Sequence, residues 1–454
     1  MHQGSGSAGT SASHEAVGGS MFPRGYMLAF GLTTVIFFVW GMSNNLTDIL
    51  VQQFRKSFEL SLLQAQLVQT SNFLAYAVMA TPAAFLMRRF GYKAGIVTGL
   101  LTFGVGTLLF WPAAIVGKYA AFLAALFVVG SGASILETAA NPLVAQFGDS
   151  LSSERRLNFA QAFNPPGTIV GVIAGTLFIF SGVEKTAAQV AAMKQQGSYE
   201  AYLHSEILRV VPTYVVLGIA VLVLALFIAR AKFPASLDSG ADAGASSRSS
   251  KGSYARLFRT PTLMFAVVAQ FFYVGAQVGT WSTFIPYLRT YTTLGDRAAG
   301  GLLTGTLIAF SLGRIVSTPL MGRFSPARMT ALYALVNIAL LAFGVAHPGM
   351  AGGVAILATS FFMSIMYPTI FALGVKGLGE DTKLGGSLLV IAIIGGAFFP
   401  LLMGGMKSLT GSLASGYLLP AAGYAVVALY AFLVPRLTDL TVSRHSVEAA
   451  PHTL

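Results

Sequence analysis

The sequence predicts an all-α membrane protein that crosses the bilayer about twelve times. Of its 454 residues, 55% are hydrophobic and only 10% are charged, a composition outside the range of soluble globular proteins. Apolar runs of about 20 residues, the length that a helix needs to cross the hydrocarbon core, recur along nearly the whole chain. Short polar breaks separate these runs.

The apolar runs define the expected spans, and the polar breaks define the connections. We place the spans at 27–50, 62–86, 94–113, 119–147, 156–181, 209–230, 261–288, 299–321, 329–346, 352–377, 384–407 and 415–435. The longest polar stretch between spans, 232–259, is rich in Ser, Ala, Gly and Asp, which is typical of a flexible linker. The expected organisation is therefore a disordered tail (1–21), an N-terminal six-helix bundle (22–231), a cytoplasmic linker (232–259), a C-terminal six-helix bundle (260–436) and a cytoplasmic C-terminal tail (437–454).

A short internal repeat supports two equivalent halves. The string Leu-Met-x-Arg-Phe occurs at 86–90, after the second expected span, and again at 320–324, after the eighth. A five-residue match is weak evidence alone, but its position at the same point of each half favours a duplicated architecture.

The basic residues predict the orientation in the membrane. Most Lys and Arg residues fall in the tails and in the connections that follow even-numbered spans, and such loops are usually cytoplasmic. Both termini are therefore expected to be cytoplasmic, in a multi-pass protein of the inner (plasma) membrane surrounded by lipid. The net charge of +12 is scattered over short loops, so we expect no nucleic-acid partner.

Several chemistries are disfavoured by composition. The chain has no cysteine, and its six histidines are scattered mostly over tails and loops, so no metal cluster is expected. No phosphate-binding loop and no soluble domain large enough to bind ATP is evident. We expect no enzyme and no cofactor, and any transport should be secondary.

Two acids, Asp48 and Glu137, are the only ones inside apolar segments. A charged side chain at mid-bilayer costs about 2.5 to 3.5 kcal/mol on insertion scales, so each should face a cavity or a partner. Burial favours the neutral form of a carboxylic acid, which allows such a group to take up and release a proton. The alternatives are an interfacial position for Asp48 and a purely structural role for Glu137.

Amides and aromatic residues share helix faces with these acids. The stripes comprise Asn44 and Asn45; Ser134, Glu137 and Asn141; Asn158, Gln161, Asn164 and Thr168; and Gln270, Tyr273, Gln277 and Trp281. Such groups suit a neutral sugar, whose hydroxyls need donors and acceptors and whose ring packs on aromatic faces. They could instead be hydrogen bonds between helices. Arg314 is the single basic residue inside a span and away from its ends, and we interpret it as structural or gating before substrate-binding.

Four strings resemble the fucose:proton symporter family of the major facilitator superfamily. They are Trp40–Leu50, Leu136–Pro142, Arg156–Asn164 and Tyr367–Gly374, and the resemblance extends from about Phe22 to Pro435. It implies the major facilitator fold, with twelve transmembrane helices in two six-helix bundles around a central cavity. It also implies that Asp48 is a protonation switch and that Glu137 lies at the sugar site.

The resemblance extends to further candidate residues. It implies sugar-site roles for Gln161, Asn164 and Tyr367, places Asn45 near the acid of the first span, and suggests a role for Phe310. We add Gln277 and Trp281 from the seventh-span stripe as substrate-binding candidates.

Two departures from the family pattern stand out. Pro165 and Pro166 follow Asn164 where small or aromatic residues are expected. The loop Arg88–Lys93 is a degenerate form of the superfamily's loop motif that lacks its acid, so Arg88 and Arg89 are gating candidates without an assigned contact.

The leading hypothesis is a proton-coupled symporter, functional as a monomer, that imports a neutral monosaccharide, with L-fucose the favoured substrate. Protons would be the coupling ion. Glucose/galactose or N-acetylhexosamine import by the same family is an alternative, and a non-transporting sugar receptor or a proton-antiport efflux protein are remoter ones.

Overall fold

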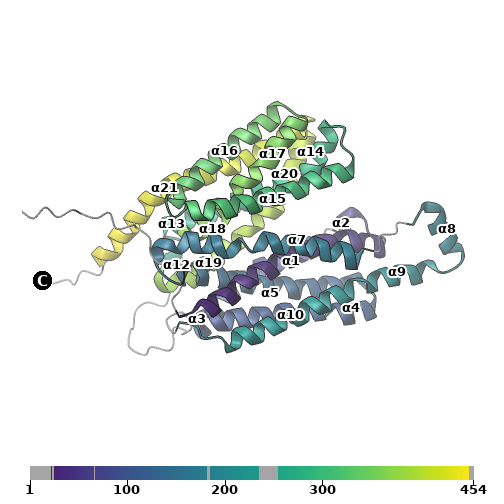
Figure 1. Cartoon of the computed structure of the whole chain (residues 1–454), viewed down its shortest axis with the longest axis horizontal. Helices are drawn as coiled ribbons and strands as arrows, with labels where there is room; N and C mark the ends of the chain where they lie inside the picture. Colours follow the sequence, from purple (N-terminus) through teal and green to yellow (C-terminus); the bar gives the residue numbers. More distant parts are fainter. Residues whose placement is uncertain (1–21, 23–24, 66, 181–184, 235–253, 449–454) are drawn as a thin grey trace, which may run out of the picture.

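The computed structural model describes residues 22, 25–65, 67–180, 185–234 and 254–448, apart from the side chains of 48, 62–63, 187, 296–297, 380 and 437–448. The expected tail at 1–21 and most of the expected linker lie outside the described residues. In the described part, all regular structure is helical. Figure 1 shows two groups of helices that meet near α12, α18 and α19 and diverge toward α8 and α14.

The described residues of the first half form ten α-helices and two short segments of other helix types. They are α1 (Met27–Ser57), α2 (Leu62–Ala65), α3 (Leu67–Leu108), α4 (Phe110–Val116), α5 (Tyr119–Gln146), η1 (Ser150–Ser152), α6 (Ser153–Gln161), α7 (Asn164–Ala174), η2 (Gly175–Ile179), α8 (Ala187–Gln195), α9 (Tyr199–Leu208) and α10 (Val210–Arg230).

The second half has the same general plan. It consists of α12 (Tyr254–Leu257), α13 (Pro261–Ser282), α14 (Phe284–Tyr291), α15 (Asp296–Leu320), α16 (Pro326–Ala346), α17 (Met350–Met363), α18 (Met366–Val375), η4 (Gly379–Asp381), α19 (Thr382–Ile391), η5 (Ala392–Ile394), α20 (Gly395–Thr410), η6 (Ala414–Tyr417) and α21 (Leu418–Glu448). The last helix continues through Arg436 into the segment that the sequence suggests as a tail. We call the end where α10 stops and α13 begins the linker end, and the opposite end the α8 end.

Twelve spans result from the helices, because one helical segment turns back on itself. Eleven helical segments of the described chain are long and apolar enough to cross a membrane, and one of them, Leu67–Val116, has 50 residues. At about 1.5 Å per residue a straight helix of that length would reach about 75 Å, more than twice the hydrocarbon core. Gly91, with φ 84° and ψ 171°, breaks this segment into two spans. A glycine tolerates this backbone conformation, which other residues rarely adopt.

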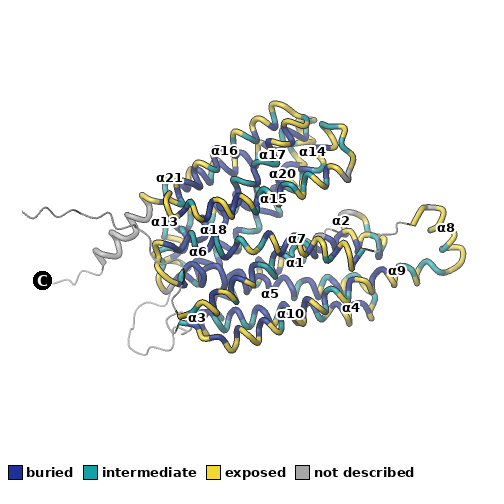
Figure 2. Tube along the Cα trace, viewed as in Figure 1, coloured by how far each residue is buried: buried dark blue, intermediate teal, exposed yellow. Residues whose placement is uncertain are grey.

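Burial follows the expected pattern of a bundle in lipid. Large apolar residues remain exposed on the outer sides of helices; on α10 they are Val216, Ile219, Val223, Leu226 and Phe227. Buried residues concentrate on the inner faces, as Figure 2 shows along α5 and α18. Apolar surface that would be unfavourable in water is compatible with a hydrocarbon environment.

The fifth span is broken and packs closely against the first. It consists of α6, α7 and η2, and a side chain at Gly167 or Gly171 would collide with the backbone of α1. A side chain at Gly41 of α1 would likewise meet the backbone of Asn164. Small residues let helix backbones approach closely. This contact fixes the position of the break, and therefore of Gln161 and Asn164, against α1.

Candidate functional site

A buried carboxylate and a buried phenol join the two halves of the chain. Glu137 of α5 is 4% exposed and Tyr367 of α18 is 7% exposed. The Tyr367 hydroxyl donates a short hydrogen bond to Oε1 of Glu137. Sequence analysis placed both residues at one site, and the structure brings them together.

Amides and another aromatic pair surround this contact in the first half. Asn141 lies one turn after Glu137 on α5, and its Oδ1 accepts a 2.7 Å hydrogen bond from Nε2 of Gln161. Tyr76 of α3 lies within electrostatic reach of the Glu137 carboxylate, and its hydroxyl accepts a 2.8 Å hydrogen bond from Nε1 of Trp40. A polar network thus extends from α6 through α5 to α3.

Several buried polar atoms of this region form no hydrogen bond with another described group. They are Oε2 of Glu137, Nδ2 of Asn141, Oδ1 of Asn158, and both Nε2 and Oε1 of Gln270. Gln270, on α13, is fully buried and interacts with Tyr367. Because buried polar atoms are nearly always hydrogen-bonded, this mixture of donors and acceptors can bind a ligand that supplies both, as sugar hydroxyls do.

A second aromatic group lies in the other half. Trp281 of α13 packs edge-on against Phe310 of α15 with ring centroids 5.3 Å apart, and its Nε1 donates a 3.1 Å hydrogen bond to Ser360. Gln277 is half-buried one turn before Trp281. In the described structure, no hydrogen bond joins Gln277 to Glu137 or Tyr367.

The amides of the first and fifth spans take separate positions. Asn164 is half-buried, and its Nδ2 donates a 3.2 Å hydrogen bond to the carbonyl of Phe37 on α1. Asn45 of α1 is half-buried and is not hydrogen-bonded to the Glu137 network within the described part of the chain. Asp48 falls within the range of α1, but its side chain lies outside what the structure describes.

The three candidate gating arginines differ in environment. Arg314 of α15 is 3% exposed and donates hydrogen bonds to the carbonyls of Ser364 (2.9 Å) and Gln161 (2.6 Å). Arg88 is half-buried and Arg89 exposed, both just before the turn at Gly91. The Arg89 guanidinium lies 5.2 Å from the ring centroid of Phe90.

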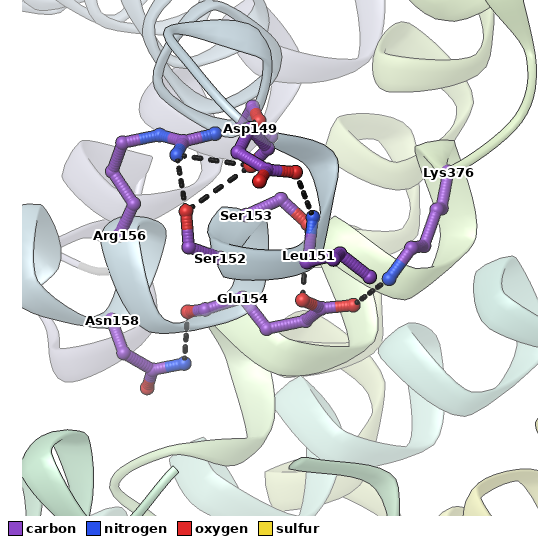
Figure 3. Close-up of polar contacts among 9 residues, drawn as sticks. Asp149, Leu151, Ser152, Ser153, Glu154, Arg156, Asn158 and Lys376 are labelled. Atoms are coloured by element: carbon purple, nitrogen blue, oxygen red, sulfur yellow. Dashed lines mark hydrogen bonds and ion pairs between the residues drawn. The ribbon is translucent and has the colours of Figure 1, made fainter. Parts of the chain in front are cut away.

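Charged residues connect the halves at the linker end, and sequence analysis missed them (Figure 3). Glu154 of α6 is 3% exposed; its Oε1 accepts a 2.8 Å hydrogen bond from Lys376, and its Oε2 one of 3.1 Å from Ser153. Asn158, one turn along α6, donates a 3.0 Å hydrogen bond to Thr369. These contacts lie nearer the linker end than the Glu137–Tyr367 bond.

Arg156 ties the end of α5 to the beginning of the fifth span, and Figure 3 shows its bonds to Asp149 and Ser152. It is fully buried and donates to the carbonyls of Val144, Ala145 and Asp149 and to the hydroxyl of Ser152. The last carbonyls of a helix lack partners within the helix, so this arginine caps α5.

The residues missed from the sequence fall into two groups. Tyr76, Asn141 and Gln270 belong to spans, and the polar stripes contained the last two without marking them as site residues. Glu154 and Lys376 were assigned to loops or to the edge of a span, where charges are ordinary. Because they belong to different halves, no local pattern pairs them.

Two helical bundles joined through buried polar groups, with no extended soluble domain in the described chain, define a polytopic membrane transporter. The Major Facilitator Superfamily model matches residues 29–400, and the chain belongs to this superfamily. It is 41% identical to the L-fucose-proton symporter of Escherichia coli over 409 residues, which cover 90% of this chain and 93% of the relative. It is 34% identical to the glucose/galactose transporter of Brucella abortus over 412 residues, covering 90% and 95%.

A solved structure gives the same result for the fold. The crystal structure of the E. coli fucose:proton symporter superposes with a TM-score of 0.82 at 40% identity, covering 90% of this chain and 99% of that chain. The prediction of a twelve-span major facilitator fold is confirmed.

Proposed function

We propose that the protein is a proton-coupled symporter that imports a neutral monosaccharide, with L-fucose the favoured substrate. The observation that carries the proposal is the Glu137–Tyr367 bond across the two halves, surrounded by buried amides whose donors and acceptors are incompletely used. The relatives support it, because the L-fucose-proton symporter of E. coli is similar over nearly its whole length.

Glu137 is proposed to carry a proton and to bind the sugar, with Asp48 as the second proton-coupling acid. Gln161, Asn164, Tyr367 and Asn45 are proposed as polar sugar contacts. Gln277, Trp281 and Phe310 complete the proposed site in the second half, where the Trp281–Phe310 pair offers apolar ring surface. Gln270 joins this set because its buried amide interacts with Tyr367.

Transport is proposed to proceed by alternating access between a bundle at 22–231 and a bundle at 260–436, joined by the linker at 232–259. The cross-half contacts from Glu154–Lys376 to Glu137–Tyr367 fit a state that is closed at the linker end. Arg314 and the loop arginines Arg88 and Arg89 are proposed to act in the gate. Each chain would hold a complete pathway as a monomer, in the inner (plasma) membrane with both termini cytoplasmic.

The test is uptake of radiolabelled L-fucose into proteoliposomes. An inward proton gradient should drive sugar above its external concentration, and a protonophore should abolish the accumulation. Liposomes without protein are the control. Uptake that does not depend on the proton gradient would contradict the proposal, and so would the finding that no neutral sugar is taken up.

A second candidate substrate is glucose or galactose, because a transporter of these sugars is 34% identical over nearly its whole length. Unlabelled D-glucose, D-galactose and N-acetylglucosamine should be compared as competitors in the same assay. Competition by glucose or galactose that exceeds that of L-fucose would favour this alternative.

A further inference from the structure

Two proline residues, one in each half, remove backbone donors at breaks in the helices. In an α-helix, the N–H of each residue bonds to the carbonyl four residues earlier, and proline has no N–H. Pro165 therefore cannot bond to the carbonyl of Gln161, where α6 ends. Pro368 likewise cannot bond to the carbonyl of Ser364, in the gap between α17 and α18.

One buried arginine bonds to both of these carbonyls. Nη1 of Arg314 donates to Gln161 over 2.6 Å, and Nε donates to Ser364 over 2.9 Å. The guanidinium carbon also lies 4.7 Å from the ring centroid of Phe310, one turn earlier on α15. A guanidinium presents donors in fixed directions, which a lysine ammonium does not reproduce.

The backbone of α15 lies close to the gap between α17 and α18, within reach of the Ser364 carbonyl. A side chain at Gly313, next to Arg314, would collide with the carbonyl of Phe361 and approach the Ser364 hydroxyl. A glycine at this position allows α15 to pack directly against the end of α17, which brings the short reach from Arg314 to Ser364 into range.

We propose that Arg314 is a positioning residue that clamps together the two proline-broken helices, one from each half, in the state closed at the linker end. The proposal rests on the proposed alternating access. The clamp holds Gln161, whose side chain bonds to Asn141, and the segment before Tyr367 in register around Glu137. Ser364 and Phe310 belong to the same half as Arg314, so opening the linker end breaks only the bond to Gln161.

The clamp makes a specific prediction about Pro165. Replacing it with alanine restores an N–H that can bond to the Gln161 carbonyl, so the carbonyl no longer depends on Arg314. The cost of replacing Arg314 should therefore shrink when Pro165 is replaced as well, a coupling that a double-mutant cycle measures. Pro400 of α20 is the matched control, because it lies inside a helix and, within the described structure, forms no hydrogen bond with Arg314.

The experiment measures the conformational equilibrium with spin labels in proteoliposomes. The chain has no cysteine, so Leu151→Cys in the first half and Phe324→Cys in the second report on the linker end without background labelling. Both side chains are exposed. Arg314→Lys should raise the population with a long label distance by about tenfold, the effect of losing a charged hydrogen bond. The same substitution should have an effect of less than about threefold in the Pro165→Ala background, and the full effect in the Pro400→Ala background.

An equal effect of Arg314→Lys in all three backgrounds would overturn the clamp. Thermal unfolding of each variant checks the fold. If Arg314→Lys does not fold, Pro165→Ala alone should still shift the label distances, whereas Pro400→Ala should not. Identical label distances in these two variants would overturn the proposal. Sugar uptake is measured on the same samples. Lack of uptake by the native chain together with the expected distance changes would remove the proposed substrate while leaving the clamp intact.

Discussion

Two buried glutamates bridge the same two halves, and their partners differ. Glu154 meets a cation, Lys376, at the linker end, whereas Glu137 meets a neutral phenol, Tyr367, deeper in the bundle. A neighbouring cation favours the charged form of a carboxylate. A carboxylate among amides and phenols has only neutral partners, so it can gain a proton without leaving a cation unpaired. The comparison suggests that the first pair holds a gate closed and that the second can exchange a proton and bind a sugar.

The largest effect is expected at Glu137. Glutamine in its place keeps the size of the side chain but cannot lose a proton, so proton-driven accumulation of L-fucose should fall by about 100-fold or more. Uptake under an imposed pH gradient measures this, and Asp48→Asn provides the parallel test of the second acid. Normal uphill accumulation by both variants would refute the assignment of these two acids to proton coupling.

A smaller effect is expected from breaking the pair at the linker end. Lys376→Met leaves Glu154 buried without its cation, which should weaken the closed state by about 2 kcal/mol, less than the 3 to 5 kcal/mol typical of fully buried pairs because Lys376 is partly exposed. Spin-label distances at the linker end measure the shift. Glu154→Gln combined with Lys376→Met should recover part of it, and if the double variant is as open as Lys376→Met alone, the pair does not act as a latch.

Tyr367→Phe tests the second pair, Glu137–Tyr367. It removes the hydroxyl that bonds to Glu137 while keeping the ring, so the apparent affinity for sugar should fall by about tenfold, as for other hydrogen bonds to a charged or strongly polar group. Concentration dependence of uptake measures the change. Tyr333→Phe is the control, because its hydroxyl bonds to Ser317, away from the Glu137 network. Equal losses in both variants would argue against a specific role for Tyr367.

The smallest effect is expected at the α8 end. Lys194 and Glu59 form an ion pair 3.3 Å long, and both side chains are 54% exposed. Exposed pairs contribute little because water and salt screen them. Lys194→Ala should therefore change the equilibrium constant of thermal unfolding and the rate of sugar uptake by less than about twofold. If Lys194→Ala reduced stability or uptake as much as Lys376→Met does, exposure to solvent would not explain the difference between the Lys194–Glu59 and Lys376–Glu154 pairs.

Much of the fold could be predicted because hydrocarbon imposes a length on every span. The apolar runs predicted the twelve spans, and the lone acid in the fourth run marked Glu137 as a candidate site residue. The turn at Gly91 also agrees with the expected break between the second and third spans.

Other parts of the site depend on contacts between distant segments. The prolines at 165 and 368 identify carbonyls without helical donors, but sequence alone does not indicate that one arginine bonds to both. Glu154 and Lys376 are separated by 222 residues, and each has an ordinary loop environment when considered alone. Only the packing of the halves shows that the glutamate is buried.

The cap formed by Arg156 has a consequence for how the protein can recognise its cargo. It ties the end of α5 to η1 and the start of α6, and the Gln161–Asn141 bond joins the same two helices nearer Glu137. Under the proposed alternating access, these three groups would move together and present the same face to the solute in both states. A difference in solute affinity between the two states would then come from the second half, where Tyr367 and Gln270 face Glu137 in this state.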